Sequence, residues 1–64
     1  MIEYKIYAYI SDGTIITIPV KYEKVYDLRR DVTNMGVNGI LQEVENGFKY
    51  YPPNKIDKIE IEKI

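Results

Sequence analysis

The side chains best suited to hold a charged ligand stand near the middle of the sequence. Arg29 and Arg30 are the only arginines, and Tyr26 precedes them by three and four residues, so a helix would bring the three side chains near one another. A guanidinium group beside an aromatic ring can hold a carboxylate or a phosphate. Tyr26, Arg29 and Arg30 are therefore candidate residues for binding a small molecule such as a nucleotide. We favour the alternative, an exposed helix face that also carries Asp27 and Asp31.

The residue types that most enzymes use for catalysis are scarce. The chain has no histidine and no cysteine, which removes the side chains that titrate near neutral pH, the common zinc ligands and any disulfide. Ser11 is the only serine, and it stands in a turn sequence where its hydroxyl serves the backbone. The acidic residues do not cluster, and the glycines occur singly at turns. We therefore expect no catalytic residue, no metal site, no cofactor and no enzymatic activity.

Tyrosines form a second candidate site. Tyr7 and Tyr9 alternate with the most apolar positions of the N-terminal segment, so they should lie on the outer face of a strand, beside Ile15 of the next strand. Tyr51 joins them because it should point opposite to Tyr50, away from the core. Tyrosine is amphipathic and enriched at protein interfaces, so Tyr7, Tyr9, Ile15 and Tyr51 are candidate partner-binding residues. The alternative is that these tyrosines only stabilise a hairpin, or that later strands cover both faces.

The apolar alternation in the first twenty residues predicts a β-hairpin with a defined register. A three-residue loop Ser11-Asp12-Gly13, with the glycine in the left-handed region, brings the apolar faces of the two strands together. A two-residue loop would place the apolar face of one strand beside the polar face of the other. The predicted cross-strand pairs are Ala8 with Ile16, Ile6 with Ile18, and Tyr4 with Val20. Pro19 indicates that the second strand lies at a sheet edge.

A second hairpin is predicted in the segment ILQEVENGFKYY, residues 40–51. A three-residue loop Glu45-Asn46-Gly47 would place Val44 opposite Phe48 on one face, with Ile40 on the same side. On the other face it would place Glu43 opposite Lys49, a favourable pair of opposite charges. A two-residue Asn-Gly loop is the alternative that we reject, because it would set Val44 against Lys49.

Between the hairpins, an apolar stripe predicts one α-helix. Val25, Leu28, Val32 and Met35 are spaced three, four and three residues apart, so they share one helix face that should cover the sheet. Gly36 is the expected end of the helix, because glycine readily adopts the left-handed conformation that follows a last turn.

The two prolines near the C-terminus predict a corner before a last strand. Pro52-Pro53-Asn54 cannot continue a hydrogen-bonded ladder, and Ile56 should anchor the corner in the core. Ile59 and Ile61 alternate with charged residues, which is typical of a half-exposed strand along an open sheet edge. The fold class is thus α+β: a small curved antiparallel sheet with the order β-β-α-β-β-β and one helix packed on it.

Length and charge limit the remaining possibilities. The chain of 64 residues forms one small domain, 1–64, which hides only about 60% of the surface that its unfolded form exposes. No disulfide or zinc site adds stability, so we expect a homo-oligomer, most simply a homodimer. The formal net charge of -1 provides no basic surface, which disfavours nucleic acid as a partner. No apolar run reaches the roughly 18 residues of a membrane span, and the first residues lack a signal-peptide pattern, so we expect no membrane partner and a cytoplasmic location.

The composition also resembles that of a known class of proteins. Ile, Lys, Tyr and Asn, whose codons are rich in A and T, fill close to half of the chain. In this respect the sequence resembles the short uncharacterised accessory proteins of phages and plasmids of low-GC Gram-positive bacteria, which implies an accessory or host-interfering role. Our leading hypothesis is a non-enzymatic interaction protein that binds and modulates or inhibits a host protein, or binds its own copy. The alternative is an oligomer that sequesters a small molecule or a nucleotide in a cleft between subunits.

Overall fold

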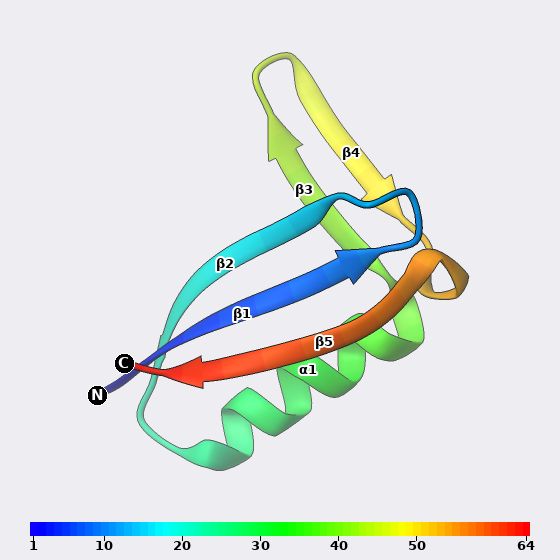
Figure 1. Ribbon diagram of the computed structural model, residues 1–64. Coiled ribbons are helices and arrows are strands. Elements are labelled where there is room, and N and C mark those ends of the chain that lie inside the picture. Colours follow the sequence, from blue (N-terminus) through cyan, green and yellow to red (C-terminus); the bar gives the residue numbers. More distant parts are fainter.

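The computed structural model describes residues 1–64 and confirms the predicted order of elements (Figure 1). The chain forms one α-helix, α1, five β-strands and a short 3-10 turn, Pro53–Lys55, that precedes the last strand. The strands are β1 (Ile2–Ile10), β2 (Ile15–Tyr22), β3 (Ile40–Val44), β4 (Gly47–Tyr51) and β5 (Ile56–Lys63), and α1 spans Val25–Asn38. The fold is therefore α+β, with one helix packed on an antiparallel sheet. No helix of this protein has the length and apolar composition needed to cross a membrane.

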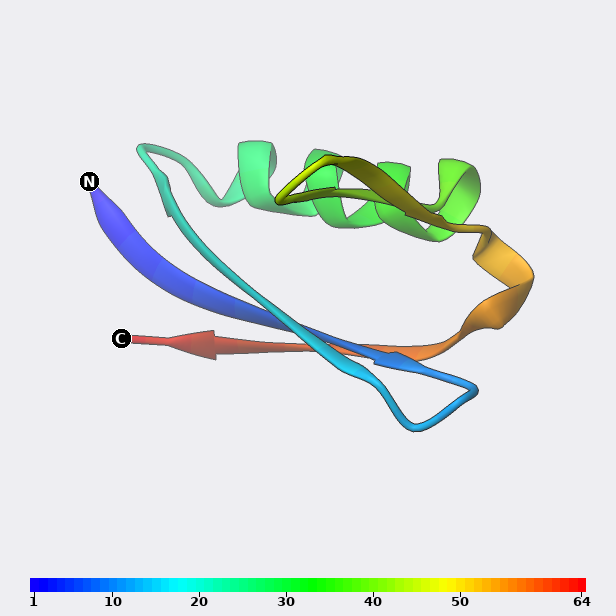
Figure 2. The same ribbon diagram turned by 90° about the horizontal axis from the view of Figure 1, so that it is seen from above.

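The five strands divide into two sheets. β1 lies at the centre of a three-stranded antiparallel sheet in the order β2-β1-β5, and β3 pairs only with β4. Both α1 and the β3-β4 hairpin lie on the same side of the three-stranded sheet (Figure 2). β2 is an edge strand, as Pro19 predicted.

The register of the first hairpin is as predicted. Ala8 pairs with Ile16, Ile6 with Ile18, and Tyr4 with Val20. Gly13 has a positive φ of 96°, and its N–H donates to the Ile10 carbonyl at 2.9 Å. This glycine permits the tight bend that keeps the two apolar faces on the same side.

The register of the second hairpin differs from the prediction. Val44 pairs with Gly47, Glu43 with Phe48, and Gln42 with Lys49, so only Glu45 and Asn46 form the loop. The three-residue loop was therefore wrong, and Val44 does not face Phe48. The reason lies at the base of the hairpin, where Ile40 and Tyr51 pair and both enter the core. Burial of this pair fixes the register that the loop sequence alone left open.

The helix is longer than predicted at its C-terminal end. It continues through Gly36 to Asn38 and is followed by Gly39, whose φ of 86° allows its N–H to donate to the Met35 carbonyl at 3.0 Å. Gly36 is thus a helical residue, and the predicted stop was wrong by three positions. Of the predicted stripe, Leu28 is buried and Met35 packs against the core, whereas Val25 is exposed.

The proline corner is present as predicted. Pro52 is extended, Pro53–Lys55 form the 3-10 turn, and β5 then runs antiparallel to β1. Ile56 is partly buried and pairs with Ile10 after a register shift between Tyr9 and Ile10. The core on the inner face of the sheet has two clusters. Tyr4 and Ile6 pack with Leu28 of the helix, and the second cluster joins the sheet to the base of the hairpin: Ala8, Ile10, Ile16, Ile40 and Tyr51.

Candidate functional site

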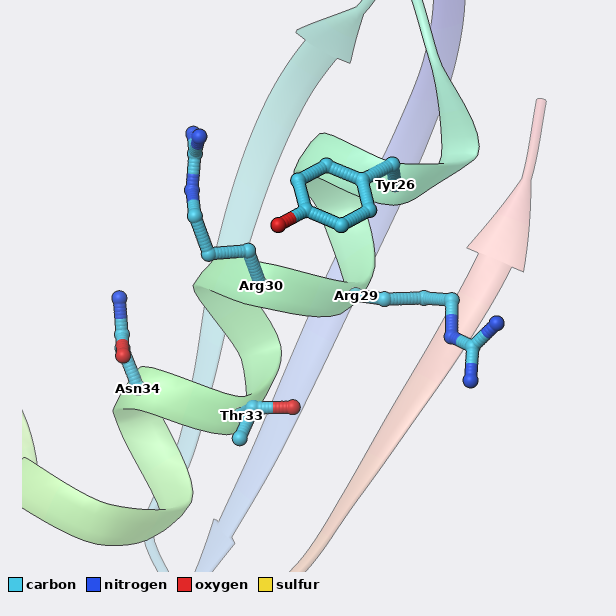
Figure 3. A pocket seen from close by; sticks show the side chains of 5 residues that line it. All are labelled: Tyr26, Arg29, Arg30, Thr33 and Asn34. Carbon is cyan, nitrogen blue, oxygen red and sulfur yellow. The ribbon is translucent and has the colours of Figure 1, made fainter.

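The arginine and tyrosine candidates line a shallow depression on α1. The depression has a volume of about 410 Å³, and all of its lining residues belong to this one helix: Tyr26, Arg29, Arg30, Thr33 and Asn34 (Figure 3). Figure 3 shows Arg29 and Arg30 extending in different directions, with the ring of Tyr26 between them. The two guanidinium groups therefore do not converge on one anion.

Arg30 is already engaged by acidic neighbours. Its Nη1 lies 3.4 Å from Asp27 Oδ1, and its Nε lies 3.3 Å from Asp31 Oδ1. Both contacts are exposed ion pairs on the helix surface. This is the arrangement expected of an ordinary exposed helix face, the alternative that we favoured from the sequence. Arg29 makes no ion pair. A ligand would therefore meet one unpaired guanidinium group on an open helix face, which is a weak basis for a phosphate or carboxylate site.

Asp31 also connects the helix to the end of β2. Tyr22 Oη donates a hydrogen bond to Asp31 Oδ2 at 2.7 Å. This hydrogen bond, together with that from Arg30, holds the pKa of the Asp31 carboxyl below its usual range. Partial burial and the neighbouring carboxylate raise the pKa of Tyr22 to about 12. Both shifts are explained by this structural contact.

Tyr7 and Tyr9 lie on the outer face of the sheet, as the first-hairpin register requires, but β5 contacts both. Tyr7 Oη donates to Glu62 Oε1 at 3.1 Å, and Lys58 Nζ lies 4.7 Å from the centre of the Tyr9 ring. Desolvation and the Glu62 carboxylate raise the pKa of Tyr7, and the Glu60 carboxylate raises that of Tyr9. These tyrosines are half-buried, whereas Ile15 of this face is 55% exposed. The outer face is thus less available to a partner than the sequence indicated.

The placement of Tyr51 in the partner-binding set was wrong. Tyr51 is 6% exposed and belongs to the core cluster with Ile40, and Lys49 Nζ lies 5.2 Å from the centre of its ring. Tyr50, which was expected to point inward, is 55% exposed. The two tyrosines occupy opposite faces of β4, and the true register gives the inner face to Tyr51.

The most exposed large apolar side chains of the hairpin form a surface that sequence reasoning missed. The pairs Leu41–Tyr50 and Glu43–Phe48 place Leu41, Phe48 and Tyr50 on the same face, and we call these three residues the hairpin face. Leu41 is 64%, Phe48 65% and Tyr50 55% exposed. The aromatic alternation in Phe48-Lys49-Tyr50 was the available signal, but its direction depends on the register.

The hairpin meets the rest of the protein mainly at its base. Figure 1 shows β3 and β4 projecting beyond the three-stranded sheet. At the base, Tyr50 Oη donates to the Asn38 carbonyl at 2.7 Å, which ties the hairpin to the end of α1. A groove of about 240 Å³ separates the edge of β2 from β3, with Ile16–Pro19 on one side and Ile40–Glu43 on the other. The hairpin face therefore stands next to a further concave surface.

The acidic residues form no metal centre. No group of three or more His, Cys, Asp or Glu side chains is placed to hold a metal ion, and every buried side-chain nitrogen and oxygen atom has a hydrogen-bond partner. The candidate site with the clearest geometry is the hairpin face.

The comparisons with known proteins add no relative. No protein-family model matches the chain, and no curated protein or solved structure matches it either.

Proposed function

We propose that this chain is a non-enzymatic interaction protein that binds another protein through the hairpin face, Leu41, Phe48 and Tyr50. The observation that carries the proposal is the exposure of these three side chains, each more than half exposed on one side of a projecting hairpin. A single large apolar residue on a surface is ordinary, but neighbouring ones gathered on one face are typical of interaction sites.

Binding energetics favour such a surface. Burial of a Phe or Leu side chain stabilises by about 1.5 to 3 kcal/mol relative to exposure. Aromatic residues also lose little conformational freedom when they are fixed, and Tyr is enriched among the residues that dominate binding energy. A two-stranded hairpin is only marginally stable by itself, so a partner that covers its exposed face would also stabilise the hairpin.

The class of partner follows from the composition rather than from the geometry. The resemblance to phage and plasmid accessory proteins supports a host protein as the partner, with modulation or inhibition as the result of binding. An apolar surface such as Leu41, Phe48 and Tyr50 suits a complementary apolar cleft on a folded protein, where these side chains act as anchors. The net charge of -1 supports a protein partner over a nucleic acid.

The proposal is tested by recovering partners from the cells that encode the protein, with tagged wild type and variants and quantitative mass spectrometry. Leu41→Asp and Phe48→Asp alter the hairpin face, and Val44→Asp is the matched control. Val44 belongs to the same hairpin but shares its face with Gln42, on the opposite side. Tyr7→Ala and Tyr9→Ala test the outer sheet face in the same experiment.

We expect one protein to be retained by the wild type and by Val44→Asp and to be lost with Leu41→Asp and Phe48→Asp. Melting curves of all variants must show that each is folded. If the partner is kept by both hairpin variants and lost with Tyr7→Ala and Tyr9→Ala, the outer sheet face is the binding surface and the assignment to the hairpin is refuted. If no partner depends on either face, the interaction function itself is contradicted.

A further inference from the structure

The two edges of the three-stranded sheet differ in their ability to accept another strand. The edge strand β2 contains Pro19, which has no N–H to donate. β5, the other edge strand, has eight residues and no proline. The groove beside β2 also places β3 close to that edge, whereas β5 has no neighbouring strand on its outer side (Figure 1).

The backbone of β5 presents unpaired groups along this edge. The Ile64 N–H donates to the Glu3 carbonyl, and the alternation of an antiparallel ladder then directs the main-chain groups of Glu62, Glu60 and Lys58 toward β1. The N–H and C=O groups of Ile59 and Ile61 consequently point outward, and no other segment of the chain bonds them. The Ile61 side chain is 44% exposed although its position pairs with the buried Ile6. This edge thus carries both open hydrogen-bonding groups and uncovered apolar surface.

We propose that a second copy of this chain pairs with this edge, β5 against β5, in antiparallel orientation around a two-fold axis at Glu60. The two three-stranded sheets then form one continuous six-stranded sheet. In this register Ile59 of each copy faces Ile61 of the other, so their outward main-chain groups bond and the exposed part of Ile61 is covered. The proposal concerns a surface separate from the hairpin face and does not depend on the proposed function.

Charge complementarity and the pairing of Ile59 with Ile61 together select this register. Lys58 of each copy faces Glu62 of the other on the outer sheet face, which gives two pairs of opposite charge. Only Glu60 meets its own equivalent, and each Glu60 carboxylate already lies 3.7 Å from Lys58 Nζ of its own chain. A shift of the two-fold axis to Ile61 would place Glu60 opposite Glu62 twice. A shift to Ile59 would pair Lys58 with Glu60 twice, but it would place Ile61 opposite Asp57 and leave the exposed part of Ile61 uncovered. Both shifts are less favourable.

The dimer should be weak, because strand pairing at one edge buries less than the roughly 1,200 Å² of a stable protein–protein interface. Sedimentation over a wide range of protein concentration should therefore show a mass that rises from the monomer value of 7.5 kDa toward twice that value. A mass that stays at the monomer value up to the highest soluble concentration refutes the proposal.

A charge exchange tests the register. Lys58→Glu and Glu62→Lys each create two like-charged pairs across the axis, so each should weaken the dimer by about tenfold. The double variant Lys58→Glu/Glu62→Lys restores two attractive pairs and should recover the wild-type dissociation constant. Lys21→Glu, a charge reversal on the outer face of β2, is the control and should leave the constant unchanged. Single variants that dimerise like the wild type, or a double variant that does not recover, contradict the proposal.

Lys58 and Glu62 also contact Tyr9 and Tyr7 of their own chain, so substitutions at these two positions change contacts within the monomer as well. Amide hydrogen exchange tests the proposed pairing without such substitutions. The amides of Ile59 and Ile61 should exchange fast in dilute protein and gain protection as the dimer forms. The Thr17 amide, on the open edge of β2, should remain unprotected. A dimer in which Ile59 and Ile61 stay unprotected uses another surface and refutes the proposed pairing at the β5 edge.

The Phe48→Asp variant separates this proposal from the proposed function. It should dimerise like the wild type, because Phe48 lies on the hairpin face and not on β5.

Discussion

Replacement of Gly39 by alanine should destabilise the protein strongly. Gly39 has φ 86° and ψ -173°, a backbone conformation that is essentially restricted to glycine. A Cβ atom at this position would overlap the Tyr51 carbonyl oxygen and would lie 2.9 Å from both Cε1 and Oη of Tyr50. The tyrosine side chain of residue 50 can move, but the Tyr51 backbone belongs to the buried base of the hairpin. The strain must therefore be relieved by displacement of β4 or of the helix end.

The expected magnitude follows from these two contributions. The backbone conformation costs about 1 to 3 kcal/mol for a residue with a side chain, and the overlap with main chain adds to it, so we expect a loss of about 2 to 4 kcal/mol. A domain of this length has a free energy of unfolding of about 3 to 10 kcal/mol. Each kcal/mol corresponds to roughly 4 to 8 °C in melting temperature for domains of about this size. The Gly39→Ala variant should thus melt at least about 10 °C below the wild type.

Gly36→Ala is the matched control, because Gly36 is helical and a Cβ there meets no atom within 4 Å. Alanine is preferred over glycine inside a helix by about 0.8 to 1 kcal/mol, so this variant should be more stable than the wild type. Urea denaturation followed by circular dichroism measures both changes, with similar slopes if only stability changes. If Gly36→Ala were the destabilising substitution and Gly39→Ala were neutral, the helix would end at Gly36 and our account of this boundary would be refuted.

Two further predictions concern the tyrosines. Tyr51→Ala should lower the free energy of unfolding by about 3 to 5 kcal/mol because it empties a core position, whereas Tyr50→Ala should cost about 1 kcal/mol for its hydrogen bond to Asn38; equal losses in urea denaturation would contradict the observed register. Tyr22→Phe should flatten the dependence of the urea midpoint on pH at both ends. In the wild type the folded state holds the Tyr22 proton more tightly than the unfolded chain, so the contribution of this residue is present below pH 10.0 and is lost as the pH rises through about 12. The folded state holds the Asp31 proton less tightly, so its contribution is present above pH 3.8 and is lost as the pH falls below that value. Identical profiles for the two proteins would show that the Tyr22–Asp31 contact does not form in solution.

The first hairpin was predictable because its strands carry long alternating patterns. Eight cross-strand pairs lie on the two faces, and only one register keeps Ile6 and Ala8 on the same side as Ile16 and Ile18. The loop glycine, Gly13, agrees with that register. The turn sequence and the apolar alternation therefore indicated the same register. The prolines likewise indicated the corner before β5 and the edge position of β2.

The second hairpin was not predictable because its strands have five residues each and no clear alternation. Its register is set by the burial of Ile40 and Tyr51 against β1 and β2, which are distant in sequence. The error moved Tyr51 from the core to the surface and concealed the hairpin face. The helix end at Gly39, where Gly36 was predicted, depends in the same way on contacts with β4, because Tyr50 and Tyr51 approach Gly39 closely.

The candidate site was therefore predictable only where local patterns sufficed. The helix pattern placed Tyr26, Arg29 and Arg30 on exposed positions of α1 and brought Asp27 and Asp31 to Arg30, as the favoured alternative required. The alternation of β1 placed Tyr7 and Tyr9 on the outer face. Their coverage by Glu62 and Lys58 could not be predicted, because the sequence did not specify which edge β5 would join.

The central position of β1 has a consequence for how the protein folds. β1 precedes both of its partner strands in the sequence, and it pairs on one side with the adjacent β2 but on the other side with β5, which follows β3 and β4. During translation, the first hairpin can form early, but the edge of β1 that β5 joins stays open until β5 has been synthesised. Closure of that long chain segment is costly in entropy and slow. A chain in which β5 has not yet paired should consequently expose this main-chain edge of β1 as an aggregation-prone edge, so β5 (Ile56–Lys63) completes the sheet.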